Sequence, residues 1–352
     1  MQLTVISDGV LLSQKDGCFQ LRKGDQKKRI SPQRLTSILL CNRCQLTTQA
    51  LVLAMEHHID VLLLNHYGEP VGRFWYGQHG RSVRIRRVQL KESQTLEGFL
   101  YALPWLKTRL HGQGQFLKQL AKSRPKKVHK MEPFILQIEN AQEALLSLTG
   151  ELFDAIGRVV RAEAEVTEYF RERVMGVEGS ASRAFFRGLS YILPEPYSFS
   201  SRSRRPAQDP FNAALNYAYG ILYGRVERAC LLAGLDPYVG FLHTDHPYRP
   251  ALVCDLIEPF RIWAERVVTF LFTRRKLNQS HFLVTSEGVF LDSSGKELLV
   301  PAFQEHVDEK IRLLRRNVPR GSICLHEAHR LANGLMTSKP LPSEWFLEVA
   351  EF

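Results

Sequence analysis

The sequence predicts an α+β fold, in which an N-terminal β-rich domain precedes a larger all-helical domain. Up to about residue 90, apolar residues come in short β-prone runs separated by turn-forming residues. From about Thr95 onward, they recur with the period of an amphipathic helix. A chain of 352 residues is long enough for two domains that each bury a core. We therefore predict domains at 1–92 and 93–333, and a C-terminal tail at 334–352.

Short strands and one helix are expected in the N-terminal domain. Strands are predicted at 3–6, 11–13, 18–21 and 34–41. Asp16-Gly17 separates the second and third of these and favours a two-residue hairpin turn. Thr47 or Thr48 is placed to cap a helix that runs to His58, and the apolar run 61–64 returns as a buried strand.

Helices dominate the remainder of the prediction. They are expected over 99–119, 133–148, 152–169, 181–188, 212–233, about 250–277, and about 301–316. The run 198–209 is polar, basic and contains proline, so we interpret it as a mobile loop. A small hairpin is expected at 282–291. Pro259 removes a hydrogen bond to the carbonyl of residue 255, and this predicts a kink inside its helix.

The charge of the chain indicates a polyanionic partner. Lys and Arg number 47 against 36 Asp and Glu, which gives a net charge of +11. Any one basic cluster is most often a solvated face, but several clusters together favour extended contact with phosphates. Two of these clusters supply candidate DNA contacts: Arg202, Arg204 and Arg205 in a Ser-rich loop, and Arg274, Arg275 and Lys276.

The sequence favours neither a membrane protein nor a disulfide-bonded secreted protein. No apolar run approaches the length of a membrane span, and the first residues lack the pattern of a signal peptide. We therefore expect a cytoplasmic protein without membrane contact, whose six cysteines are reduced. Cys41 and Cys44 form a lone Cys-x-x-Cys without a second pair, so we expect thiols at the end of a strand and not a zinc site.

The segment 240–261 contains the strongest candidates for chemistry. It holds His243, Asp255, Glu258 and Arg261, the last three at helical spacing i, i+3, i+6. Two acids on one stripe among apolar residues are costly unless a cation neutralises them. Carboxylates with one imidazole suit Mg²⁺ or Mn²⁺ better than Zn²⁺. The alternative is an ordinary solvated face with weak ion pairs.

Two further segments favour the metal interpretation. Small residues flank Glu178, and Ser180 with Ser182 are placed to cap a helix that carries Arg183, which is a further candidate DNA contact. Downstream, a helix is predicted to present amide and phenol groups on one face, where they would contact phosphates or support a metal site. Those groups belong to Asn212, Asn216 and Tyr219.

With these segments in place, the chain resembles the CRISPR-associated spacer integrases over roughly residues 1 to 330. Four blocks occur in the family's order: Glu-Gly-x-x-x-Arg-x-x-Phe at Glu178, Asn-x-x-x-Asn-x-x-Tyr at Asn212, Gly-Leu-Asp-Pro followed by Gly-Phe-Leu-His at 234–243, and Asp-Leu-x-Glu-x-Phe-Arg at Asp255. The resemblance implies that Glu178, His243 and Glu258 bind the metal. Asp255 would be an outer-sphere or alternative ligand, and Arg261 would face a DNA phosphate. The third of these ligands, Glu258, is replaced by Asp in some members of the family.

The resemblance also implies a function in CRISPR adaptation, hence in antiviral defence. A DNA 3′-hydroxyl would attack a phosphodiester in the recipient repeat without a covalent enzyme intermediate, and water at the same site would give endonuclease activity. The implied partners are double-stranded DNA (incoming fragment and repeat), a second copy of the chain that dimerises through residues 1–92, and a small ferredoxin-like companion subunit. Two other functions remain open: a DNA-binding architectural subunit with a structural or inactive pocket, and a structure-selective nuclease of DNA repair.

Overall fold

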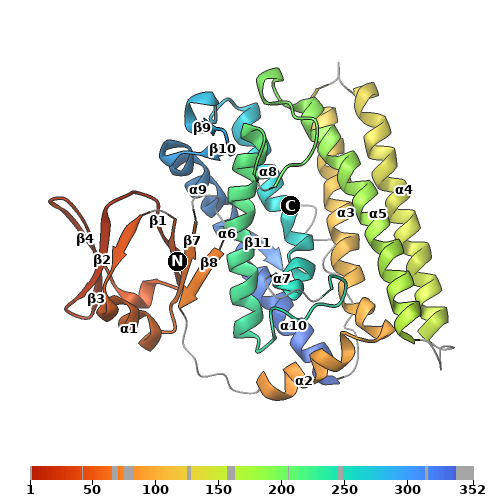
Figure 1. Cartoon of the computed structure of the whole chain (residues 1–352), viewed down its shortest axis with the longest axis horizontal. Coiled ribbons are helices and arrows are strands. Elements are labelled where there is room, and N and C mark those ends of the chain that lie inside the picture. Colours follow the sequence, from red (N-terminus) through yellow and green to blue (C-terminus); the bar gives the residue numbers. More distant parts are fainter. Residues whose placement is uncertain are drawn as a thin grey trace.

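The structure is a computed structural model that describes residues 2–41, 43–65, 70–74, 82–124, 128–156, 163–204, 206–244, 249–313 and 316–337. Strands occupy the N-terminal part and helices predominate after it, which confirms the predicted α+β class (Figure 1). The second region is not purely helical, because it includes the hairpin predicted at 282–291 and a second hairpin that was not predicted.

The N-terminal strands form two four-stranded sheets, ordered β1-β5-β7-β8 and β4-β3-β2-β6. The predicted turn at Asp16-Gly17 is confirmed, because both residues have positive φ and join the antiparallel strands β2 and β3. Thr47 caps helix α1 by accepting a hydrogen bond from the N–H of Ala50. The bounds are β1 Gln2–Val5, β2 Val10–Lys15, β3 Cys18–Lys23, β4 Gln26–Ile30, β5 Ser37–Leu40, β6 Cys44–Leu46, α1 Thr48–Glu56, β7 Asp60–Leu64 and β8 Pro70–Phe74.

The second region is built around long helices. In Figure 1, α3, α4 and α5 stand together on the side away from the sheets, and α6 lies between them and the β-rich part. None of the described helices is both long and apolar enough to cross a membrane. The bounds are α2 Ser82–Glu92, α3 Phe99–Lys122, α4 Val128–Ile156, α5 Glu163–Ile192, α6 Pro210–Leu232, α7 Ala251–Leu256, α8 Arg261–Thr273, β9 Phe282–Thr285, β10 Gly288–Leu291, α9 Ser293–Asp308, β11 Lys310–Leu313, β12 Arg316–Pro319 and α10 Ile323–Thr337.

The structure corrects several predicted helix boundaries. Helix α4 continues through Gly150, where a break was expected, because its packing against α3 and α5 outweighs the weak helix propensity of one glycine. Helix α5 is likewise continuous through 181–188, so Ser180 and Ser182 lie in its interior and cap nothing. The helix expected over 301–316 ends at Asp308, where β11 follows.

The kink predicted at Pro259 is present. Helix α7 ends at Leu256, a 3-10 turn occupies Glu258–Phe260, and α8 begins at Arg261. Proline cannot donate the helical hydrogen bond, so the backbone tightens here instead of continuing as one α-helix. The interruption places Glu258 at the start of the 3-10 turn, between α7, which carries Asp255, and α8, which begins at Arg261.

The β-rich part is fixed to the helical part through α6. A Cβ atom at Gly224 would lie 2.0 Å from Cδ2 of Leu62 in β7, so the Leu62 side chain occupies the space that a side chain at position 224 would need. Arg73 of β8 donates to the carbonyl of Gly224 at 2.6 Å and pairs with Glu227 at 3.0 Å. The predicted boundaries at 92 and 333 stay predictions; α2 packs against α10, and α10 runs through residue 333 to Thr337.

Candidate functional site

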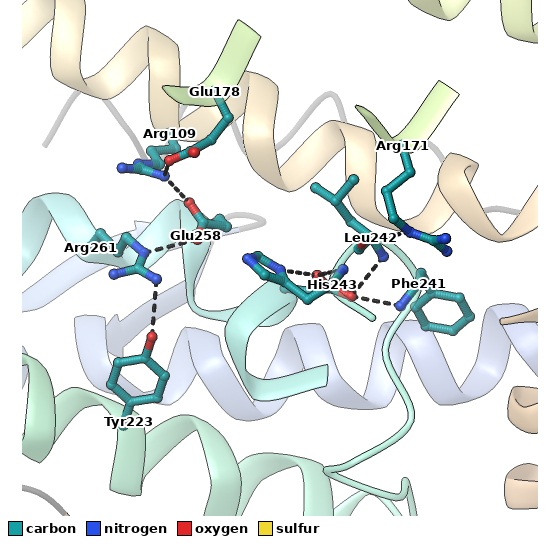
Figure 2. A network of polar contacts seen from close by, with 10 residues as sticks. Arg109, Arg171, Glu178, Tyr223, Phe241, Leu242, His243, Glu258 and Arg261 are labelled. Carbon is teal, nitrogen blue, oxygen red and sulfur yellow. Dashed lines mark hydrogen bonds and ion pairs between the residues drawn. The ribbon is translucent and has the colours of Figure 1, made fainter. Parts of the chain in front are cut away.

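Two acids from separate helices converge on one arginine. The Nη1 atom of Arg109, on α3, lies 2.5 Å from Oε1 of Glu178 on α5 and 2.5 Å from Oε2 of Glu258 (Figure 2). Its Nη2 atom donates to Oγ of Ser182 at 2.9 Å. Arg109 is only 4% exposed. Two predicted metal ligands, 80 positions apart in sequence, therefore share one cationic nitrogen.

The second oxygen of Glu258 is held by Arg261. Oε1 of Glu258 accepts a hydrogen bond from Nε of Arg261 at 2.9 Å, and Nη2 of Arg261 donates to the hydroxyl of Tyr223 at 3.0 Å. Burial alone would raise the pKa of Glu258, but the charges of Arg109, Arg261 and His243 outweigh it and lower that pKa to about 2. Glu258 is therefore a carboxylate throughout the neutral range.

Arg261 itself is buried. The resemblance implied that it faces a DNA phosphate, yet it is 6% exposed and its guanidinium lies over the rings of Tyr219 and Tyr223. In the described structure its contacts are internal, and they hold Glu258 in place.

Asp255 orients His243 and the backbone before it. Its carboxylate accepts hydrogen bonds from the N–H groups of Phe241 at 2.6 Å, Leu242 at 3.0 Å and His243 at 2.9 Å. Its Oδ1 atom, which accepts the backbone N–H of His243, also lies 2.6 Å from Nδ1 of the His243 ring. Arg171, on α5, holds the segment 241–243 in place by donating to the carbonyl of Leu242 at 2.9 Å. Asp255 thus fixes the orientation of the His243 ring and of the backbone at residues 241–243.

The imidazole of His243 is turned toward Glu258 (Figure 2). Burial opposes protonation of the ring, but the hydrogen bond and charge of Asp255, with a further contribution from Glu258, raise the pKa of His243 above its ordinary value. With Nδ1 engaged by Asp255, Nε2 is the nitrogen left for a ligand.

The donor set of the site fits a hard divalent cation. Among the described residues, no three His, Cys, Asp or Glu side chains gather closely enough to hold a metal as they stand. Glu178 and Glu258 nevertheless direct one oxygen each at a single positive nitrogen, and the His243 ring, oriented by Asp255, is turned toward Glu258 (Figure 2). Two carboxylate oxygens and one imidazole suit Mg²⁺ or Mn²⁺.

Arg202 has an internal position that the sequence did not indicate. It donates to Oδ1 of Asn212 at 2.7 Å and of Asn216 at 2.5 Å, and its guanidinium lies over the rings of Phe186 and Tyr219. Burial lowers its pKa to about 10. The hydroxyl of Tyr219 donates to Glu265 at 2.7 Å. The side chains of Arg202, Asn212 and Asn216 therefore fasten the 198–209 loop to α6.

Other candidate DNA contacts do face solvent. Arg183, on α5 just beyond Glu178, is exposed. Arg204 is exposed in the loop, and Arg205 lies outside the described residues. At the end of α8, three consecutive basic side chains are exposed, namely Arg274, Arg275 and Lys276.

Arg109 is the main residue of the site that the sequence prediction missed. A signal was present, because Arg109 and Gln113 fall within the apolar stripe of α3 formed by Leu106, Leu110 and Phe116. A buried charge in such a stripe requires a partner, and Glu178 and Glu258 supply it. Ser182, Tyr223 and Arg171 were also missed as supports, and nothing in their local sequence distinguishes them.

Comparison with known proteins gives one consistent family. The profile of the family described as CRISPR associated protein Cas1 matches residues 3–305. A "CRISPR-associated endonuclease Cas1 1" of Archaeoglobus fulgidus is 31% identical over 336 residues, covering 93% of this chain and 94% of that protein. A protein of the same name from Thermus thermophilus is 32% identical over 339 residues, covering 96% of each.

Solved structures agree on the fold. A casposase bound to an integration product superimposes with a TM-score of 0.79 at 19% identity, over 99% of this chain and 93% of that one. A Cas1 protein from Thermotoga maritima gives a TM-score of 0.73 at 21% identity, over 96% and 97% of the two chains. From the profile match and the two relatives above 30% identity, we conclude that the chain belongs to the Cas1 family of CRISPR-associated proteins.

Proposed function

We propose that this chain is a divalent-metal-dependent DNA integrase and endonuclease that inserts short DNA fragments into a CRISPR repeat array. Its relatives are named CRISPR-associated endonucleases. The observation that carries the proposal is the convergence of Glu178 and Glu258 on one cationic nitrogen beside the oriented ring of His243.

The proposed reaction is a direct phosphoryl transfer. A DNA 3′-hydroxyl attacks a phosphodiester of the repeat, one P–O bond forms, and the P–O bond to the displaced 3′-oxygen breaks. Water as the attacking group gives hydrolysis at the same site. Mg²⁺ or Mn²⁺, when bound by Glu178, His243 and Glu258, supplies a lower pKa for the attacking hydroxyl and compensation for charge at the phosphorus centre.

The remaining residues act by positioning. Asp255 holds Nδ1 of His243, so that the ring serves as a neutral ligand through Nε2 and not as a general base. Arg261 fixes one oxygen of Glu258, which leaves the other directed at the centre of the site. We propose that exposed side chains, including Arg183 and those of Arg274, Arg275 and Lys276, contact the DNA backbone, since phosphate contacts supply most of the affinity.

Double-stranded DNA and other protein chains are the proposed partners. One chain of a solved structure whose title reads "Cas6-RT-Cas1--Cas2 complex" superimposes with a TM-score of 0.78 at 20% identity, over 97% of this chain and 35% of that one. We propose that this chain likewise assembles with a small ferredoxin-like companion subunit, and that it forms a homodimer through residues 1–92. Gel filtration of the chain alone and mixed with a candidate companion tests both assemblies.

An integration assay tests the central proposal. A labelled short duplex and a repeat-bearing plasmid are incubated with Mg²⁺ or Mn²⁺, with and without chelator. Joined products that require metal and disappear in Glu258→Gln are expected. Cut products without joined ones would favour a repair nuclease, and DNA binding with neither product would favour an architectural subunit. Arg73→Met, at the interface between β8 and α6, is the control for loss of a buried charge elsewhere.

A further inference from the structure

The guanidinium of Arg109 occupies the position where the two predicted carboxylate ligands, Glu178 and Glu258, meet, and this is where a bound metal ion would have to lie. We propose that Arg109 is a built-in counter-ion that holds Glu178 and Glu258 together in the metal-free protein and gives up this position when the divalent cation binds. The proposal rests on the proposed function, because it takes these two acids to be metal ligands.

The first support is electrostatic. The side chains of Arg109 and Glu258 are 5% and 4% exposed, and that of Glu178 is 22% exposed. Two carboxylates directed at one point repel each other, and a buried charge without a partner is strongly unfavourable. A positive nitrogen within 2.5 Å of both acids removes this repulsion without any metal.

The second support is the incomplete bonding of the guanidinium. Nη1 is shared between the two acids and Nη2 donates to Ser182, but Nε finds no hydrogen-bond partner among the described residues. Guanidinium groups bind a carboxylate most strongly through two parallel hydrogen bonds, and Arg109 forms no such pair with either acid. Its interaction is therefore weaker than a buried arginine can achieve, which favours displacement.

The third support is the division of the carboxylate oxygens. Glu258 gives Oε1 to Arg261 and Oε2 to Arg109, so displacement of Arg109 frees one oxygen while Arg261 keeps the side chain in position. Metal binding and the Arg109 contacts compete for the same oxygens, namely Oε1 of Glu178 and Oε2 of Glu258. Competing equilibria are linked, so loss of Arg109 must strengthen metal binding and weaken the metal-free fold.

The test compares Arg109→Met with wild-type protein in the absence of DNA. Methionine fills a similar buried volume but carries no charge. Mn²⁺ binding is measured from the electron paramagnetic resonance signal of the free ion, and thermal unfolding is followed in chelator and in saturating Mn²⁺. We expect the Mn²⁺ dissociation constant to fall about ten-fold or more. We also expect the Tm in chelator to fall, and Mn²⁺ to restore most of it.

The chain offers a matched control. Arg73 is likewise a buried arginine between two acids, with its Nε 3.4 Å from Asp60 and its Nη2 3.0 Å from Glu227, but it lies at the interface between β8 and α6. Arg73→Met should lower the Tm equally in chelator and in Mn²⁺, and it should leave the Mn²⁺ dissociation constant at the wild-type value. This control separates the loss of a buried ion pair from an effect on the metal site.

The outcomes distinguish the two proposals. If wild-type protein binds Mn²⁺ and Glu258→Gln does not, the metal site holds; an Arg109→Met dissociation constant equal to or weaker than wild type then overturns only the counter-ion role. If Glu258→Gln leaves Mn²⁺ binding unchanged, the proposed metal site itself fails. Should Arg109→Met fold in neither condition, Arg109→Gln decides, because its neutral amide can still donate hydrogen bonds but carries no positive charge to hold the two acids together. Its dissociation constant should fall, and an unchanged value overturns the proposal.

Discussion

Oδ1 of Asp255 lies 2.6 Å from Nδ1 of His243, and the same carboxylate accepts three successive backbone N–H groups. Glu258, three residues later, instead reaches Arg109 and Arg261. Two acids at helical spacing therefore have separate partners: Asp255 lies in α7, and Glu258 lies in the 3-10 turn that follows it.

Because Asp255 and Glu258 contact different partners, two isosteric substitutions, Asp255→Asn and Glu258→Gln, should reduce integration activity to different extents. Asp255→Asn loses part of the support for His243, and a lost outer-sphere partner typically costs about 10- to 100-fold, on the order of 1 to 3 kcal/mol. We expect weak integration that improves with raised Mn²⁺. Glu258→Gln removes a ligand charge and should not recover. A side-by-side metal titration checks both, and the reverse order of damage would assign the ligand role to Asp255.

Removal of the predicted ligands should separate chemistry from DNA binding. Glu178→Ala, His243→Ala and Glu258→Ala are each expected to abolish strand transfer while duplex binding survives, since affinity comes from many Lys and Arg contacts. Strand-transfer and filter-binding assays on the same preparations provide the measurement. Near-normal integration with Mg²⁺ by any one variant would show that its position is not a ligand.

Metal binding should depend on pH through His243. Although burial opposes it, Asp255 raises the pKa of this ring, and a metal ligand must be the neutral imidazole. The Mn²⁺ affinity should therefore increase as the pH rises from the ordinary imidazole pKa of about 6.5 through the raised value. In Asp255→Asn this increase should occur at lower pH. Mn²⁺ titrations at several pH values test this, and identical profiles would contradict it.

The same shift affects stability with the opposite sign. A raised pKa in the folded state means that the contribution of protonated His243 with Asp255 is fully present below the unfolded pKa of imidazole and is lost as the pH rises through the folded value. In chelator, the free energy of unfolding should fall over this range, and the fall should be smaller in His243→Gln. Urea unfolding at matched pH values provides the measurement.

The exposed basic residues after α8 should contribute to DNA binding, whereas Arg202 should not. Joint replacement of Arg274, Arg275 and Lys276 by Gln is expected to weaken binding to all DNA sequences and to reduce the slope of log affinity against log salt by about 0.9 for each phosphate that the variant no longer neutralises. Arg202→Gln should lower the Tm and leave the slope unchanged, because its contacts are internal. An unchanged slope in the triple variant would mean that these residues face away from DNA.

Two glycines within helices should respond oppositely to alanine. At Gly224 the new methyl group would lie 2.0 Å from Leu62, so Gly224→Ala should destabilise the protein by about 1 to 3 kcal/mol. At Gly150 nothing lies within 4 Å, so Gly150→Ala should stabilise it by up to about 1 kcal/mol. Denaturant unfolding measures both. Equal effects would show that the packing of β7 on α6 does not constrain residue 224.

Local physics made parts of the fold predictable from the sequence. The turn at Asp16-Gly17 needs two positive φ angles, Thr47 has a hydroxyl that accepts a free N–H in the first turn of α1, and Pro259 cannot complete a helical hydrogen bond. Each of these depends on neighbours within a few residues. The helix boundaries inside α4 and α5 were wrong because contacts between the two helices, and not local propensity, decide them.

For the site, the residue types and the family motifs can be read from the sequence, and they are enough to name Glu178, His243 and Glu258 as candidate ligands. The folded structure was needed to show that Arg109 joins two of them, that Asp255 supports His243, and that Arg202 points inward. These contacts cannot be read from the sequence because their partners lie far apart along the chain: Arg109 meets its acids across 69 and 149 positions. A hydrogen bond forms only within about 3 Å, so its partner is chosen by how the helices pack.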